Sequence, residues 1–196
     1  RNSLIMDVGM NCVNLVITGN PGVGKHTIAD LFIKHDSSYQ IFDINKFAIE
    51  KEFGEQVDDG IEVDTGKLKD EIQKLNLNKS LIVGHLAPYV LDQSDINFAI
   101  ILRKNPYDLI EVYKKRKYKN SKIKENSGSE ILGVIANDSI TSFGKEKSFE
   151  IDATNKTPEI ILEQIHNIIN NQKGGDMVDW LRLVEEKNEI NKFFDY

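Results

Sequence analysis

Residues 19–27 read GNPGVGKHT, a glycine-rich motif that leaves few fold classes open. An apolar run at residues 12–18 precedes the motif, and residues 28–33 carry apolar side chains at helical spacing. A strand, a glycine-rich turn and a helix start form the context that a phosphate-binding loop requires. The glycines let successive backbone N–H groups turn toward an anion, and the helix N-terminus adds partial positive charge. The motif therefore predicts nucleotide phosphate binding, with Lys25 reaching the outer phosphates.

The position after the lysine departs from the strict phosphate-loop pattern. That pattern has Ser or Thr directly after the lysine, whereas this chain has His26 there and its hydroxyl one position later, at Thr27. The arrangement G-x-P-G-x-G-K-x-[ST] is similar to the version found in nucleoside monophosphate kinases. Because Mg²⁺ keeps several of its waters when it binds, we expect Thr27 to hold the metal through water.

The composition is that of a soluble protein with one domain and a sizeable core. Of the 196 residues, 40% are hydrophobic and 29% are charged, and no apolar run approaches the length of a membrane span. The net charge of −6 argues against general coating of nucleic acid, and we expect neither sequence-specific nucleic-acid binding nor a membrane partner. The single cysteine, Cys12, cannot form an internal disulfide and is expected in the core. The N-terminus lacks a signal-peptide pattern, which predicts a cytoplasmic location.

Apolar runs that suit buried strands alternate along the chain with segments of helical periodicity. This alternation predicts a P-loop NTPase fold of the α/β class, a three-layer sandwich around a five-stranded parallel sheet. The expected strands are residues 12–18, 39–44, 80–83, 97–102 and 147–154. Helices are expected to start near Asn45, at residues 64–65, at 105–106 and at 157–158, with a further helical stretch at 129–143 and an acidic loop at 54–64.

Several polar residues directly follow the predicted strands. In parallel sheets the ligand lies at the carboxyl ends of the strands, so Gly19, His85, Arg103 and Asp152 are expected to gather at one edge. Transfer of a phosphoryl group needs positive charge around the reacting oxygens, and the planar fork of arginine suits this task. We therefore expect Arg103 to face the phosphates; the alternative is an ion pair with an acidic neighbour.

Residues 114–124 form a basic segment that begins with Lys114, Lys115 and Arg116. The segment is expected either to form a lid over ATP or to be a solvated charged helix face. A lid would exclude water from the reacting phosphoryl group. After Gly174 and Gly175, which resemble a hinge, the tail has amphipathic spacing. It is expected to pack on the domain as a helix, or else to dock onto a partner.

The chain resembles the adenylate kinase isoenzyme 6 family, also called the CINAP type, in its archaeal form. The resemblance covers about residues 13–170 and rests on an ordered set of motifs. The motifs are GNPGVGKHT, Phe47-Ala48 with the acidic stretch after it, Gly84-His85-Leu86, Ile101-Leu102-Arg103, Arg116-Lys117-Tyr118, Glu150-Ile151-Asp152-Ala153-Thr154 and Lys156-Thr157-Pro158-Glu159.

The resemblance implies a kinase domain over residues 1–172, with a monophosphate-binding segment at about 42–65 and a lid at about 115–126, followed by an extension at 173–196. It implies that ATP and AMP are converted to two ADP with Mg²⁺, that ATP is also hydrolysed, and that the protein assists maturation of the small ribosomal subunit by binding the ribosomal protein uS11. By the resemblance, the ATP-phosphate positions are Gly22, Gly24, Lys25, His26 and Thr27, the lid arginine is Arg116, and the adenine border is residues 152–158, which include Asp152 and Thr154. His85 matches a family histidine near the phosphates, with a purely structural role as the alternative. We expect Val23 to bind the phosphates as well, and we expect catalysis to depend on Lys25, His85, Arg103 and Arg116.

The sequence also departs from the family at several positions. His26 stands where many relatives have threonine, Val83 and Gly84 stand where they have an acidic residue, and Lys117 replaces a glycine. Ile49 occupies the position of an arginine in animal members. Three functions therefore stay open: an adenylate kinase, an ATP-driven ribosome-assembly factor with little kinase activity, and a kinase for another small acceptor.

Overall fold

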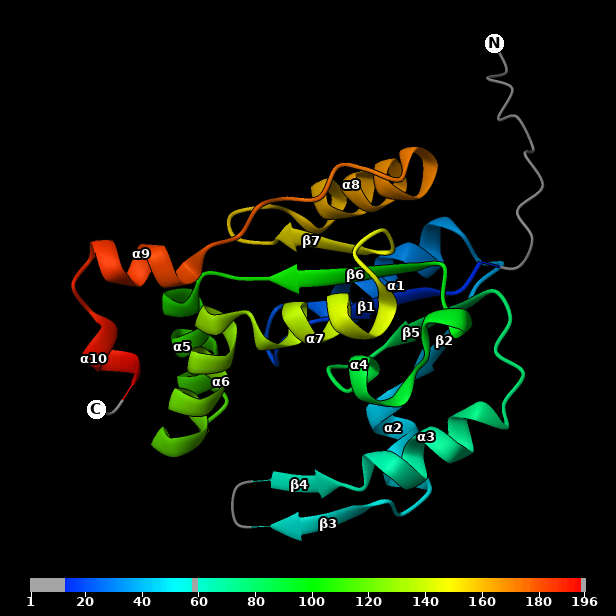
Figure 1. Ribbon diagram of the computed structural model, residues 1–196, viewed down its shortest axis with the longest axis horizontal. Coiled ribbons are helices and arrows are strands. Elements are labelled where there is room, and N and C mark those ends of the chain that lie inside the picture. The colour runs from blue at the N-terminus through cyan, green and yellow to red at the C-terminus, as the bar shows by residue number, and fades with distance from the viewer. Residues whose placement is uncertain (1–12, 58–59, 195–196) are drawn as a thin grey trace.

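The computed structural model describes residues 13–57 and 60–194, so Cys12 lies outside the described residues. Its main sheet has five parallel strands in the order β2-β5-β1-β6-β7. Figure 1 shows that the strands β1, β6 and β7 point toward the same end of the molecule. The strands are β1 (Leu15–Thr18), β2 (Gln40–Asp43), β5 (Ser80–Val83), β6 (Phe98–Arg103) and β7 (Ser148–Asp152).

Helices cover both faces of this sheet, because successive strand residues point to opposite sides. Leu15 and Ile17 of β1 join a core with α1 (Lys25–His35), α5 (Pro106–Lys115) and α8 (Pro158–Asn171). Val16, between them, joins a second core with α2 (Ile44–Glu50), α3 (Thr65–Gln73), α4 (Ala87–Val90) and Phe143 of α7 (Val134–Phe143). The predicted three-layer α/β fold is therefore confirmed. No helix in the described ranges is long and apolar enough to cross a membrane.

The acidic stretch at 54–64, predicted to be a loop, contains a hairpin, so that prediction was wrong. Strands β3 (Gly54–Val57) and β4 (Gly60–Val63) pair antiparallel. The preceding helix also begins earlier than predicted: the Asp43 carboxylate accepts a hydrogen bond from the Lys46 N–H and caps α2, in place of Asn45. Asp64 caps α3 as expected. In Figure 1 the hairpin lies at the bottom of the molecule, and helix α6 lies beside α5 between the hairpin and the end of β6.

The helical stretch predicted for 129–143 is in fact divided between two helices. Helix α6 (Asn120–Leu132) takes in half of the basic segment and ends at Gly133, which has a φ of 64°. Helix α7 begins directly after this left-handed residue. A short 3-10 helix, η1 (Gln93–Asp95), precedes β6.

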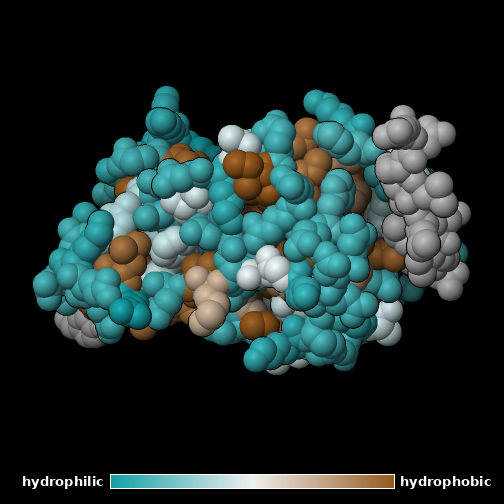
Figure 2. All heavy atoms as spheres, turned by 90° about the horizontal axis from the view of Figure 1, so that it is seen from above, coloured by the Kyte–Doolittle hydropathy of each residue, from teal (hydrophilic) through white to brown (hydrophobic). Residues whose placement is uncertain are grey.

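The C-terminal extension packs on the domain, although as two short helices instead of one. Val184 of α9 (Trp180–Glu186) and Phe193 of α10 (Ile190–Phe193) bury against Ile131 of α6. Between α8 and α9, the chain runs beside the edge strand β7, where Asp176 N–H donates to the Glu150 carbonyl oxygen at 2.8 Å. The face that carries α8 is mainly hydrophilic, with hydrophobic side chains in small separate patches (Figure 2).

Candidate functional site

The glycine-rich loop connects β1 to α1 at the carboxyl end of the sheet. Gly19 has a φ of 134°, and a Cβ atom there would lie 2.3 Å from the Leu102 carbonyl oxygen of β6. Gly24, with a φ of 102°, is the N-cap of α1. Both positions need conformations that favour glycine. The first N–H groups of α1 have no carbonyl partner within the helix, so they form the anion-binding end that the motif predicts.

Lys25 is the first residue of α1, and its ammonium group is buried beside the loop. The side chain is 7% exposed, and its Nζ donates to the carbonyl oxygens of Gly19 and Asn20, each at 2.9 Å. Burial, and next the charge of Arg116, lower the pKa of Lys25 to about 8, against the opposing carboxylates of Glu130 and Asp43. The group lies where a phosphate bound by the loop would meet a cation with little surrounding water.

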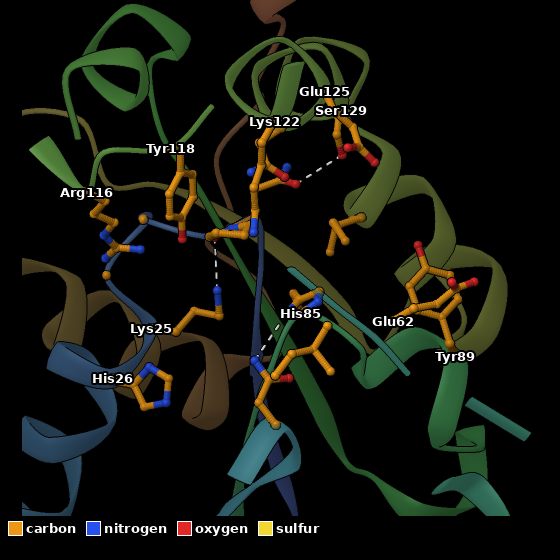
Figure 3. Close-up of a pocket in the computed structure, with 18 of the residues that line it drawn as sticks. Lys25, His26, Glu62, His85, Tyr89, Arg116, Tyr118, Lys122, Glu125 and Ser129 are labelled. Carbon is orange, nitrogen blue, oxygen red and sulfur yellow. Dashed lines mark hydrogen bonds between the residues drawn. The ribbon is translucent and has the colours of Figure 1, made fainter. Parts of the chain in front are cut away.

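A cavity of about 860 Å³ opens in front of the loop. The cations that line it lie close to Lys25 on one side: Arg116 at the end of α5 and Lys122 on α6 (Figure 3). Tyr118 lies between them, stacked on Tyr113, whose hydroxyl donates to the Pro21 carbonyl oxygen of the loop at 2.7 Å. The structure thus brings Arg116 and the start of α6 to the predicted phosphate site.

The opposite side of the cavity carries different chemistry. Glu62 of β4 and Tyr89 of α4 line it there, across from the cations (Figure 3). His85, just past β5, lies between the two sides, with its Nδ1 at 3.3 Å from Asn45 Nδ2. Burial, followed by the charges of Lys25 and Lys122, lowers the pKa of His85 to about 4. His85 is therefore a neutral imidazole at pH 7.

His26 and Thr27 project from the first turn of α1 into the mouth of the cavity. His26 Nε2 lies 2.7 Å from Asp43 Oδ2 at the end of β2. Burial would raise the pKa of Asp43, but hydrogen bonds from the Lys46 N–H and from His26 outweigh it and leave that pKa below its ordinary value. Among the described residues there is no cluster of three or more His, Cys, Asp or Glu side chains that could hold a metal. The Thr27 hydroxyl suits only a cation held mainly by phosphate and water.

Arg103 does not line this cavity, and its predicted phosphate-facing position is corrected by the structure. Its side chain is 5% exposed. Its Nε donates to Glu130 Oε1 at 2.9 Å and its Nη2 to the Glu130 carbonyl oxygen at 2.7 Å, while its Nη1 is paired with Glu150. The alternative, an ion pair with acidic neighbours, is therefore what the fold adopts. The reason is that a buried guanidinium needs partners close by.

Comparison with known proteins places the chain in a family. A family model described as an AAA domain matches residues 15–133. A protein of Pyrococcus furiosus named "Putative adenylate kinase" is 34% identical over 176 residues, which cover 88% of this chain and 93% of that protein. A protein of Thermococcus kodakarensis with the same name is 31% identical over 88% of this chain and 95% of its own length. The chain belongs to the archaeal adenylate kinase isoenzyme 6 family. The fold of this family member is also similar to that of the shikimate kinase from Bacteroides thetaiotaomicron, with a TM-score of 0.50 at 14% identity over 81% of this chain and 98% of that one.

Two residues expected to border adenine in this family are absent from the cavity lining. Asp152 Oδ1 accepts a hydrogen bond from Thr154 N–H at 2.9 Å, and Thr154 Oγ1 accepts one from Asn105 N–H at 2.8 Å. Asp152 N–H in turn donates to Asp176 Oδ2 of the extension at 2.8 Å. The two side chains therefore fix the turn after β7, and their contact with adenine stays a prediction.

Sequence reasoning missed Glu130, which is fully buried beside the phosphate loop. Its Oε2 accepts a hydrogen bond from the loop residue Asn20 at 2.7 Å. A carboxylate inside a helix near the basic segment gave no local signal, because Asn20 and Glu130 are 110 positions apart. The one available hint was a buried arginine after β6 that required an acidic partner.

The neutral state of His85 leads to a prediction about pH and stability. Above pH 6.5 the imidazole is neutral in both the folded and the unfolded chain and contributes nothing to the pH dependence. Below that, the unfolded chain takes up a proton that the folded chain accepts only near pH 4. The free energy of unfolding should therefore fall from pH 6.5 toward pH 4, by roughly 1.4 kcal/mol per pH unit from this group. Urea titrations at several pH values between 6.5 and 4 measure this free energy. In the His85→Gln variant it should fall less steeply with decreasing pH than in the wild type; an equal dependence on pH would contradict the prediction.

Proposed function

We propose that the protein is a nucleotide kinase that transfers the terminal phosphoryl group of ATP to AMP and yields two ADP. The observation that carries the proposal is the position of Lys25, buried at the N-terminus of α1 and facing a cavity that Arg116 also lines. The names of the archaeal relatives support the same activity. Gly22, Val23 and Gly24 would present backbone N–H groups to the ATP phosphates, as would His26 and Thr27.

The chain's own groups can supply what phosphoryl transfer needs. Lys25 and Arg116 would place positive charge beside the phosphoryl group as it is transferred. Positioning of the reactants and neutralisation of their charge account for most of the catalysis of phosphoryl transfer. Mg²⁺, when bound, would neutralise charge on the outer phosphates, held by Thr27 through water. Helix α6 borders the cavity with Lys122 and would limit the entry of water as part of a lid at 115–126. The neutral His85 can orient a water molecule or a phosphate by hydrogen bonding.

A second function, ATP hydrolysis by a ribosome-assembly factor, is favoured by the charges across the cavity. A monophosphate acceptor needs cations, but the side of the cavity across from Lys25 presents Glu62 and Tyr89, and neutral His85 lies between the two sides. Ile49, at the position of an arginine in animal members, is 59% exposed. If AMP were bound only weakly, water would attack the terminal phosphoryl group of ATP in its place. The ribosomal protein uS11 and the small subunit would then be the partners, in the cytoplasm, as the resemblance implies.

Product analysis separates these functions. The full chain is incubated with Mg²⁺ and ATP, with and without AMP, and ADP and free phosphate are quantified. Formation of two ADP per ATP that depends on AMP supports the kinase, whereas phosphate release that is independent of AMP and increases with uS11 supports the assembly factor. Replacing AMP with other nucleoside monophosphates tests the third function, a kinase for another small acceptor. Absence of both products would overturn the proposal.

A further inference from the structure

Glu130 connects three parts of the molecule that are distant in sequence. It lies on α6, has no exposed surface, and its two carboxylate oxygens accept four hydrogen bonds. Oε2 accepts from Asn20 Nδ2 at 2.7 Å. Oε1 accepts from Arg103 Nε at 2.9 Å, from Lys104 N–H at 3.0 Å and from Trp180 Nε1 at 3.1 Å. A buried carboxylate that accepts hydrogen bonds from four different residues is held in one orientation.

Asn20 links this carboxylate to the lysine of the phosphate loop. A carboxylate only accepts hydrogen bonds and Ser129 Oγ donates to Asn20 Oδ1 at 3.0 Å, so the Asn20 amide can point only one way. The Asn20 carbonyl oxygen accepts from Lys25 Nζ at 2.9 Å. The side chain of Asn20 is therefore fixed by α6, and its backbone by Lys25. Rotation of Glu130 would break its hydrogen bond to Asn20, the loop residue whose backbone carbonyl oxygen accepts from the Lys25 ammonium group.

Trp180 brings the C-terminal extension into the same network. Its indole N–H is a donor that reaches Glu130 from outside the kinase core. Packing holds the extension in place near this contact, because Val184 and Phe193 are buried against Ile131, one residue after Glu130. The indole is thus aimed by packing at the carboxylate that holds the loop.

We propose that Glu130 is a positioning residue for the phosphate loop and that Trp180 of the extension fixes it, so that residues 173–196 contribute to ATP binding. The inference rests on the proposed binding of ATP by the loop. Neither residue lines the cavity, so both act through Asn20 and Lys25. The extension is then a functional part of the nucleotide site.

The charges around Lys25 give the proposal a second consequence. The charged and titratable groups that interact with its ammonium group are Arg116 at the end of α5, His85 just past β5, Asp43 at the end of β2 and Glu130 on α6. Burial and Arg116 lower the pKa of Lys25, whereas Glu130 and Asp43 raise it. Removing the Glu130 charge should therefore make Lys25 lose its proton at lower pH. ATP affinity would then decline earlier as the pH rises.

The first test compares two variants that each remove one hydrogen bond between the extension and the domain. Trp180→Phe removes the donor to Glu130, and Tyr107→Phe removes the hydroxyl that is bonded to Glu189 of the extension. Hydrogen bonds to charged groups contribute enough that their loss changes an equilibrium by about tenfold. We expect Trp180→Phe to weaken ATP binding by about three- to tenfold in calorimetry, and Tyr107→Phe by less than about twofold. Equal effects of the two variants would overturn the proposal.

The second test uses the isosteric variant Glu130→Gln, with folding checked by thermal denaturation. If it folds, its ATP affinity should fall by about tenfold or more at pH 7, and the loss of affinity with rising pH should begin at lower pH than in the wild type. A folded variant with the wild-type affinity and pH profile would refute the role of Glu130. If it does not fold, the pair Trp180→Phe and Tyr107→Phe decides. A wild-type chain that binds no ATP would instead refute the proposed function.

Discussion

Replacing Lys25 with methionine is expected to lower kcat/KM for ATP by about a thousandfold, as the loss of one preorganised charge-stabilising group does in other enzymes. Methionine has nearly the length of lysine but no charge. The ammonium group is desolvated, which strengthens its effect on a developing charge. The fold should be retained, because the variant removes a buried cation that burial already disfavours, and its hydrogen bonds go only to two loop carbonyls.

The matched control for this variant lies on the same helix. Lys34→Met removes an exposed lysine from the last turn of α1 and should leave the rate of ADP or phosphate formation within about twofold, as surface substitutions usually do. Circular dichroism would verify that both variants fold. A folded Lys25→Met variant with undiminished turnover would remove the phosphate loop from the mechanism.

The parallel sheet could be predicted from sequence because its strands are short, continuous apolar runs between glycine-rich or polar turns. The strands Leu15–Thr18 and Ser80–Val83 are buried on both faces, so each could be recognised from its own residues without knowledge of the elements that pack against it. The hairpin at 54–63 was missed because Gly54, Glu55 and Glu62 give no clean apolar alternation.

The candidate site was only partly predictable, for a physical reason. Lys25 and Arg116 belong to local motifs whose geometry follows from the strand and helix that carry them. The surroundings of Arg103 depend instead on Glu130 and Glu150, which lie 27 and 47 positions away. Local sequence shows that such an arginine must be neutralised. It does not show whether a phosphate or a carboxylate does so.

Replacing Arg103 with alanine is therefore expected to unfold the protein more readily, with a free energy of unfolding lower by about 3–5 kcal/mol, since removal of one partner leaves buried charge uncompensated. Glu130 has no exposed surface, and the side chain of Glu150 is 22% exposed. Urea denaturation followed by circular dichroism measures the change. Arg103→Lys should lie between the wild type and Arg103→Ala, because one ammonium group restores the charge but cannot span both carboxylates as the guanidinium does.

An exposed arginine of the same chain distinguishes a buried ion pair from ion pairs in general. Arg182 Nε lies 2.8 Å from Glu186 Oε1, with both side chains mostly in water, and solvated pairs contribute little to stability. Arg182→Ala should therefore leave the denaturation midpoint unchanged. If Arg103→Ala were equally harmless, the guanidinium would be dispensable to the core, and a direct role at the phosphates would again be the better explanation of its place after β6.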